Sequence, residues 1–403
     1  MAKKVVITGI GIISPIGLEA EVFFNNLIIQ NSAFSSQTFV ENNLPDIPDF
    51  YGSFLKEFSS SNYLEGKGLR SLNYESQLFM SAAVNAFRQA GLNHNLLKQR
   101  MGVCCASIFA GYNDYAKLFV DGMFAGLNRI NPSQGPQTGF NAPASQLAIY
   151  LDAQGSNLTI TSGLASGLDA LALAADFIVE NRADVILAGG VDYLSYFSAH
   201  ALLSGYKTEC IAQAPKPFDS ARQYTVFGES ACTFVVEDYA HAVARKASIL
   251  AEVCNYGRAY QHPLSNSDLK SVAERAIQQA LTQSQISPSE IDAVFASANG
   301  DYHLDAAEAN ALYTIFSSQT PVYGLKGVTG ECLGASGAMQ AAAAVLSMNK
   351  KIIPKTFGYD NPDTSLPSLS ISTETTATNL RQVLVNCLDP TGYATALILR
   401  IPD

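Results

Sequence analysis

The stretch that decides the fold spans residues 157–191. It reads Asn-Leu-Thr-Ile-Thr-Ser-Gly-Leu-Ala-Ser-Gly-Leu-Asp-Ala-Leu-Ala-Leu-Ala-Ala-Asp-Phe-Ile-Val-Glu from 157 to 180 and ends in Ala-Asp-Val-Ile-Leu-Ala-Gly-Gly-Val from 183 to 191. β-Branched residues predict a short strand over 158–161, and apolar residues at helical spacing predict a helix over 168–179. The two Ser-Gly pairs between them are turn residues. The stretch therefore predicts a strand, a sharp elbow and a buried helix.

Elbows of this kind often hold a nucleophile. The turn pushes one side chain out at the positive end of the following helix, where a thiolate or an oxyanion is stabilised. The side chain that we expect in this position is Leu164, which has no nucleophilic chemistry. Ser162 and Ser166 are the nearest hydroxyl groups, but neither occupies the nucleophile position and no general base follows them.

The elbow resembles that of the β-ketoacyl synthases of the thiolase fold. Their pattern is Thr-Ala-Cys-x-Ser-Gly, followed by a helix rich in small residues and a strand that ends in Ala-Gly-Gly. Residues 162–167 match this pattern in order, with Leu164 in place of the cysteine. Four further segments match the family in order, at 5–17, 217–229, 298–308 and 326–337. The resemblance implies an α/β protein with the thiolase-like fold, which has five layers, αβαβα, and two internally duplicated halves.

The second half of the chain repeats the first in outline. A second strand-elbow-helix unit follows the glycine turn at Gly330, as an internal duplication requires. The polar link at 238–247 is where we divide the chain, into an N-terminal ketosynthase-like half at 1–247 and a C-terminal ketosynthase-like half at 248–403. The polar segment 31–66 is predicted to be a surface excursion.

Three positions depart from the family pattern. The family's acyl-carrying cysteine and its two histidines correspond to Leu164, Asn299 and Glu331. A leucine cannot be acylated, an asparagine cannot accept a proton, and a glutamate puts negative charge where an oxyanion develops. The loss of all three resembles the chain length factors, which are the inactive partners of type II polyketide ketosynthases. Those subunits usually carry glutamine at the elbow, so Leu164 departs from them as well.

This resemblance implies a subunit that is not an enzyme as an isolated chain. It implies a heterodimer with a catalytic ketosynthase, in which the chain shapes a shared tunnel and sets the number of malonyl condensations. The strand near Leu158 is expected at the edge of the sheet, where it calls for continuation into the partner. No cofactor is expected in this chain, because the product grows on the phosphopantetheine of an acyl carrier protein that docks mainly on the catalytic subunit. Two alternatives stay open, a divergent ketosynthase-like acyltransferase or decarboxylase, and a scaffold without influence on product length.

Residues 107–122 correspond to the segment of chain length factors that lines the far end of the tunnel. By that resemblance Ile108, Gly111 and Tyr115 face the tunnel, and their spacing places them on one face of a helix. Gly111 would then leave room and Tyr115 would form a floor. An ordinary interface helix is the alternative.

Other polar residues have less specific interpretations. Lys326 and Glu229 match buried polar positions of the family and are expected to hold loops together. We interpret Cys332 as an inert buried thiol and His303 as a surface histidine, in preference to relocated catalytic groups. Residues 389–392 fall where ketosynthases carry a glycine-rich gate, and the loss of that gate fits a chain that admits no substrate through its own entrance.

Composition excludes several classes of function. In 403 residues, 48% hydrophobic and 15% charged content predict a large core and a surface that is partly lost to a partner. A net charge of -10 without basic runs argues against nucleic acid, and it would also repel an acidic carrier protein. The 7 cysteines have no zinc-ligand spacing, so no metal site is expected. Without a signal peptide or an apolar run of ~18 residues, the chain is expected to be cytoplasmic and not in a membrane.

Overall fold

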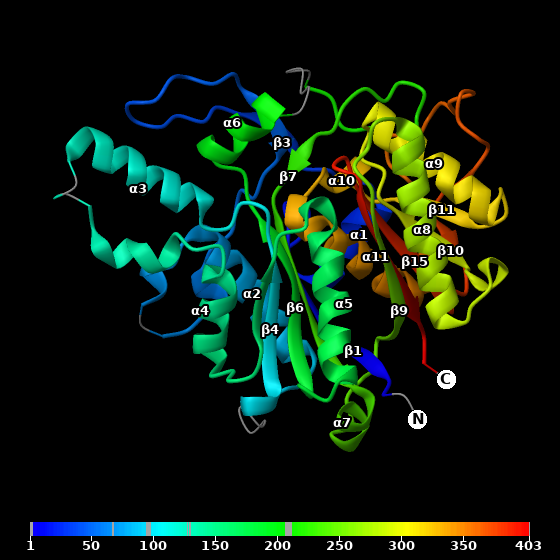
Figure 1. The fold of residues 1–403 in the computed structure, drawn as a ribbon, viewed down its shortest axis with the longest axis horizontal. Helices are drawn as coiled ribbons and strands as arrows, with labels where there is room; N and C mark the ends of the chain where they lie inside the picture. The colour runs from blue at the N-terminus through cyan, green and yellow to red at the C-terminus, as the bar shows by residue number, and fades with distance from the viewer. Residues whose placement is uncertain are drawn as a thin grey trace.

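The computed structural model describes residues 3–66, 68–93, 98–126, 128, 130–205 and 212–402. Among these residues one sheet has 11 strands (Figure 1). They are β1 Val5–Ile13, β4 Met101–Ala106, β5 Asn157–Ile160, β6 Val185–Asp192, β8 Ser230–Asp238, β9 Ala251–Tyr260, β10 Ala293–Ala296, β11 Pro321–Gly324, β13 Ser370–Ile371, β15 Gln382–Asp389 and β16 Tyr393–Arg400. Their order is β13-β11-β10-β15-β16-β9-β1-β8-β6-β4-β5.

Apart from the additional end strand β13, this order is symmetric about the pairing of β1 with β9, which is antiparallel. On one side β1 pairs with β8 and β8 with β6 in antiparallel fashion, whereas β6, β4 and β5 run parallel. On the other side β9, β16 and β15 repeat the antiparallel pairings, and β15, β10 and β11 repeat the parallel ones. The predicted internal duplication is therefore visible in the sheet.

Helices form the remaining three layers (Figure 1). They are α1 Ala20–Ile28, α2 Tyr74–Gln89, α3 Tyr112–Ala125, α4 Ala142–Leu151, α5 Ser166–Val179, α6 Tyr196–Gly205, α7 Tyr239–Ala244, α8 Asn266–Ser284, α9 Tyr302–Phe316, α10 Lys326–Thr329 and α11 Ser336–Lys350. Helices α2 and α4 cover the outer face of the first set of strands, and α8 with α9 covers that of the second. Helices α5 and α11 pack against each other between the two sets. The predicted αβαβα layering is confirmed.

The two central helices meet through a matched pair of glycines. A Cβ atom added to Gly167 would lie 2.7 Å from the backbone nitrogen of Ala338. A Cβ atom added to Gly337 would lie 2.6 Å from the backbone nitrogen of Leu168. Since real Cβ atoms do not come so close to backbone, both glycines are needed for this contact. The contact fixes the two elbows, which directly precede these glycines, close to each other.

The segment 31–66 forms part of a second sheet and contributes buried side chains, which the sequence does not predict. Its strands β2 Phe34–Gln37 and β3 Phe50–Ser53 form a small sheet with β7 Phe227–Gly228. Phe39, Phe50 and Phe54 are buried. The prediction of a surface excursion is therefore wrong for these aromatic residues, because their irregular spacing gives no periodic signal of a buried face.

The predicted half boundary at 247 lies between α7 and β9. A further pair of short strands, β12 Ile352–Ile353 and β14 Thr376–Ala377, lies in the second half. Within the described ranges every helix is too short or too polar to cross a membrane.

Candidate functional site

The first elbow lies between β5 and α5 and contains a single 3-10 turn, Gly163–Ala165. Gly163 has a φ of +73°, which is in the left-handed region that glycine adopts without steric cost. The Ser166 hydroxyl accepts a hydrogen bond from the backbone nitrogen of Ser162 at 2.8 Å and donates one to the carbonyl oxygen of Gly163 at 2.6 Å. One serine thus closes the turn that presents Leu164.

The second elbow, between α10 and α11, repeats this arrangement. The Ser336 hydroxyl accepts a hydrogen bond from the backbone nitrogen of Cys332 at 2.8 Å, as Ser166 does in the first elbow. Leu333 has a φ of +56° and occupies the place of Gly163 in the turn. The duplication seen in the sheet therefore extends to the two elbows.

The Leu164 side chain points into an apolar cluster and only 2% of its surface is exposed. We call this set the elbow cluster; its buried members are Phe39, Ile47, Phe50, Phe54, Leu164, Leu194, Tyr196, Ala199, Leu202, Phe227 and Leu333. Ile108 and Phe109 are partly buried and pack against it. The expectation that the turn pushes Leu164 out is thus corrected, since the segment 31–66 supplies aromatic side chains that cover the position.

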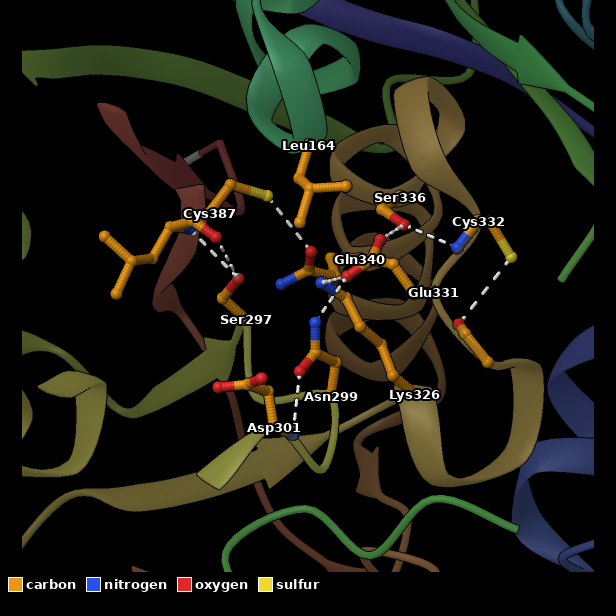
Figure 2. A network of polar contacts seen from close by, with 12 residues as sticks. Leu164, Ser297, Asn299, Asp301, Lys326, Glu331, Cys332, Ser336, Gln340 and Cys387 are labelled. Atoms are coloured by element: carbon orange, nitrogen blue, oxygen red, sulfur yellow. Dashed lines mark hydrogen bonds and ion pairs between the residues drawn. The ribbon is translucent and has the colours of Figure 1, made fainter. Parts of the chain in front are cut away.

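Below Leu164 lies a buried polar network (Figure 2). The Lys326 ammonium group lies 2.7 Å from Oε2 of Glu331, and the two side chains are 1% and 0% exposed. Burial is the largest single influence and lowers the pKa of Lys326, but the charge and hydrogen bond of Glu331, together with Cys387 and Glu308, raise it by more in sum, so the pKa is raised and the lysine stays protonated. The Ser336 hydroxyl donates a hydrogen bond to the other oxygen of Glu331. Glu331 therefore serves as the counter-charge of a buried cation.

Asn299 belongs to the same network (Figure 2). Its Nδ2 donates to Oε2 of Glu331 at 3.0 Å, and its Oδ1 accepts from the backbone nitrogen of Asp301 at 3.1 Å. Its backbone nitrogen donates to Oδ1 of Asp305 at 2.9 Å. Asn299 and Glu331, which the resemblance places at the two histidine positions, are thus hydrogen-bonded to each other next to Leu164. The amide of Asn299 is not a base, and Glu331 already accepts hydrogen bonds from Asn299 and Lys326.

The other candidates for chemistry are placed as the sequence predicts. Cys332 is buried, and burial raises the pKa of its thiol to about 12, so the thiolate is not populated at neutral pH. His303 is exposed in the first turn of α9, within 2.9 Å of Asn266. In the described part of the chain no group of three or more His, Cys, Asp or Glu side chains could hold a metal ion.

Sequence reasoning missed Asp389, the last residue of β15. Its Oδ2 atom accepts a hydrogen bond of 2.7 Å from the backbone nitrogen of Leu164. Its Oδ1 atom accepts hydrogen bonds from the backbone nitrogen and the hydroxyl of Thr391. The segment 389–392 was predicted to replace the gate of the family, but its contact with the elbow was not foreseen. The available signal was glycine at position 163, where the family pattern has alanine.

Comparison with known proteins identifies the fold and the family. Residues 2–242 match the model of the β-ketoacyl synthase N-terminal domain, and residues 248–360 match that of the C-terminal domain. The chain belongs to the β-ketoacyl synthase family. A 3-oxoacyl-[acyl-carrier-protein] synthase 2 of Coxiella burnetii is 28% identical over 374 residues, which are 90% of this chain and 89% of that protein.

Two further proteins are similar to this chain over its whole length. A putative polyketide β-ketoacyl synthase 1 of Streptomyces halstedii is 28% identical over 426 residues, which cover 100% of this chain and 99% of that protein. The solved structure of the ishigamide ketosynthase/chain length factor matches with a TM-score of 0.91 and 24% identity, and the match covers 100% of both chains. These similarities place the whole chain, and not only a segment, in the ketosynthase fold.

The three residues predicted to line a ketosynthase tunnel do not share a helix face. Helix α3 begins only at Tyr112, and Gly111 precedes it with a φ of +71°. Of the three, Ile108 packs against the elbow cluster, whereas Tyr115 is 55% exposed on α3. The prediction of a common face is wrong because the Asp192 carboxylate binds the backbone nitrogens of Ile108 and Phe109, at 2.9 Å each, and holds them in a loop.

Gly111 cannot accept a larger side chain. A Cβ atom there would lie 2.7 Å from the carbonyl oxygen of Gly139, and the left-handed backbone would add strain. A bulky residue at Gly111 would therefore strain the local backbone, so its effect would not report the volume of a tunnel. Ile108 is the position at which a change of side-chain volume is informative.

Glu229 joins two loops beside the site, as predicted for this position of the ketosynthase family. Its carboxylate accepts hydrogen bonds from the backbone nitrogens of Leu55, at 2.9 Å, and Leu194, at 3.2 Å. Burial raises the pKa of Glu229 to about 7, and the two hydrogen bonds offset only part of that effect. Leu194 belongs to the elbow cluster, so Glu229 helps to hold its cover in place.

The raised pKa of Glu229 predicts a dependence of stability on pH. Between the unfolded pKa of ~4.3 and about 7, the folded chain keeps a proton that the unfolded chain loses. The free energy of unfolding therefore falls as pH rises through this window, by at most ~1.4 kcal/mol per pH unit from this group. Glu229→Gln should remove that part of the slope. Urea unfolding at pH 5 and pH 8 measures it, and equal slopes in both proteins would contradict the assignment.

Proposed function

We propose that this chain is a non-catalytic chain length factor. It pairs with a catalytic ketosynthase, shapes a shared tunnel and sets how many malonyl units are condensed. The observation that carries the proposal is the network of Asn299, Glu331 and Lys326 next to Leu164, because the groups at the two positions that the resemblance gives to the histidines already bind one another. The growing chain would be held on the phosphopantetheine of a carrier protein. The net charge of -10 favours docking of that acidic carrier on the partner.

Two features of the surface are suited to binding a catalytic partner. Helix α3 projects from the body (Figure 1). It exposes large apolar side chains. Tyr115, Phe119 and Met123 follow at intervals of four residues and are 55%, 57% and 67% exposed. Exposed apolar rows of this kind mark interaction sites. The second feature is β5, which among the described residues is an end strand of the sheet and pairs on one side only. Both features support a heterodimer, which we expect in the cytoplasm.

Transfer of a label from a carrier-bound acyl thioester tests the absence of catalysis. The isolated chain should acquire no covalent label, and in the complex the label should be on the cysteine of the partner. The matched control is a complex whose partner cysteine is replaced by alanine. Label on this chain, for example at Cys332, would favour the rival proposal of a divergent acyltransferase. Release of carbon dioxide from malonyl-carrier protein by the control complex would favour a decarboxylase.

Product length separates a chain length factor from a scaffold. Ile108→Ala removes volume beside the elbow cluster, so the co-expressed pair should release longer products, as measured by mass spectrometry. Ile149→Ala is the control, because Ile149 is 74% exposed on α4. The same length distribution for both variants at normal yield would favour the scaffold.

A further inference from the structure

The N-terminal end of α5 is occupied by a group of the chain itself. The backbone nitrogen of Leu164 lies in the turn that precedes the helix, where unpaired N–H groups and the helix dipole attract negative charge. The Asp389 carboxylate accepts a hydrogen bond from this nitrogen at 2.7 Å, although the two residues are 225 positions apart. Asp389 is itself 3% exposed. An oxygen of any substrate would have to displace it.

Gly163 is matched to this carboxylate. A Cβ atom on Gly163 would lie 2.2 Å from Oδ2 of Asp389 and 2.8 Å from its Cγ. Alanine, the residue of the family pattern at this position, therefore cannot coexist with Asp389 in the present geometry. Gly163 and Asp389 therefore depend on each other. Replacement of the cysteine at position 164 would not by itself require either residue.

The loop after Asp389 keeps the carboxylate in place. Oδ1 of Asp389 accepts hydrogen bonds from the backbone nitrogen, at 2.8 Å, and the hydroxyl of Thr391. The backbone nitrogen of Gly392 donates to the carbonyl oxygen of Asp389 at 3.0 Å. Pro390, between them, has no N–H that it could offer to a substrate oxygen. All these contacts hold the side chain towards the elbow.

We propose that the carboxylate of Asp389 permanently occupies the backbone N–H of Leu164, which is the hydrogen-bond donor that the first elbow would otherwise offer to a substrate oxygen. With Asp389 in place, the N–H of Leu164 is not available to an acyl thioester oxygen or to a thiolate at position 164. This contact opposes the binding of an acyl oxygen at the elbow, and it is separate from the replaced cysteine and histidine positions. The inference does not depend on the function proposed above, because it is tested on the full chain without a partner.

A double-mutant cycle measures the coupling of Gly163 with Asp389. Gly163→Ala should lower the folding equilibrium constant of the full chain at least a hundredfold in urea unfolding. In the Asp389→Ala background, Gly163→Ala should lower the folding equilibrium constant only by roughly tenfold. That is the ordinary cost of a left-handed backbone for a residue with a Cβ atom. Gly91→Ala is the matched control, since Gly91 also has a left-handed backbone, with a φ of +66°, and a Cβ atom there would meet nothing within 4 Å. Its cost should be the same in both backgrounds.

An introduced thiol provides a second test if Gly163→Ala does not fold. Leu164→Cys places a sulfur next to the donor that Asp389 occupies, so the carboxylate should disfavour the thiolate. In the Asp389→Ala background the pKa of this thiol should be roughly one unit lower, as measured by the ultraviolet absorbance of the thiolate during a pH titration. An equal thiol pKa in both backgrounds, or an equal cost of Gly163→Ala in both, would overturn the proposal.

Discussion

Glu331→Gln is expected to destabilise the chain by ~3–5 kcal/mol, because it leaves the buried ammonium group of Lys326 without its counter-charge. The ion pair is 2.7 Å long and neither side chain is more than 1% exposed. The substitution keeps the shape of residue 331, so the loss reports charge and not volume. For a protein with an unfolding free energy of ~5–15 kcal/mol, such a loss is a large fraction of the total. Urea unfolding at pH 7 measures it.

Two controls separate the counter-charge from a general effect of Glu-to-Gln exchange. Glu21 pairs with Lys350 at 2.7 Å, but the two side chains are 58% and 42% exposed, so Glu21→Gln should cost less than ~1 kcal/mol. Lys326→Met combined with Glu331→Gln removes both charges and should regain most of the lost stability. A cost of Glu331→Gln no larger than that of Glu21→Gln would mean that the network does not depend on the pair.

The sequence predicts those parts of the molecule that depend on local pattern. The first elbow follows from a β-branched run, two Ser-Gly pairs and helical spacing, all within about thirty residues. The second unit after Gly330 has the same local signals, and the structure shows both elbows closed by a serine, Ser166 in one and Ser336 in the other. The alternation of such units is sufficient to predict a duplicated α/β fold.

Contacts between distant segments could not be predicted in this way. Asp389 reaches Leu164 only because β15 and β5 end near the same place in the layered fold, and no periodicity encodes that meeting. The start of α3 was also misplaced, because the carboxylate of Asp192, some 80 residues away, holds Ile108 in a loop. The sequence singles out both Lys326 and Glu331, but it does not predict that they form an ion pair.

Thr159→Pro is expected to weaken the proposed heterodimer by roughly a hundredfold while leaving the subunit folded. The backbone nitrogens of Val103 and Ser107 donate to the carbonyl oxygens of Ser156 and Ile160. Even-numbered residues of β5 therefore bond to β4, and the N–H and C=O groups of Thr159 are directed to the free edge. Proline at this position removes one N–H of that edge and adds a ring, without removing a hydrogen bond of the sheet.

The size of this effect follows from what a strand-to-strand interface uses. Each hydrogen bond contributes ~1 kcal/mol, and a carbonyl group of the partner left buried without a donor costs a further ~1–3 kcal/mol, which together amount to roughly a hundredfold in the dissociation constant.

Thr159→Val is the matched control: it keeps the N–H, and it removes a buried hydroxyl for which the described residues provide no hydrogen-bond partner. It should therefore bind the partner as the unaltered chain does. Light scattering and titration with the labelled ketosynthase measure both variants. Because β5 is the outermost strand of the first set in the sheet that the described residues form, unchanged affinity of Thr159→Pro would contradict pairing of the partner with this edge.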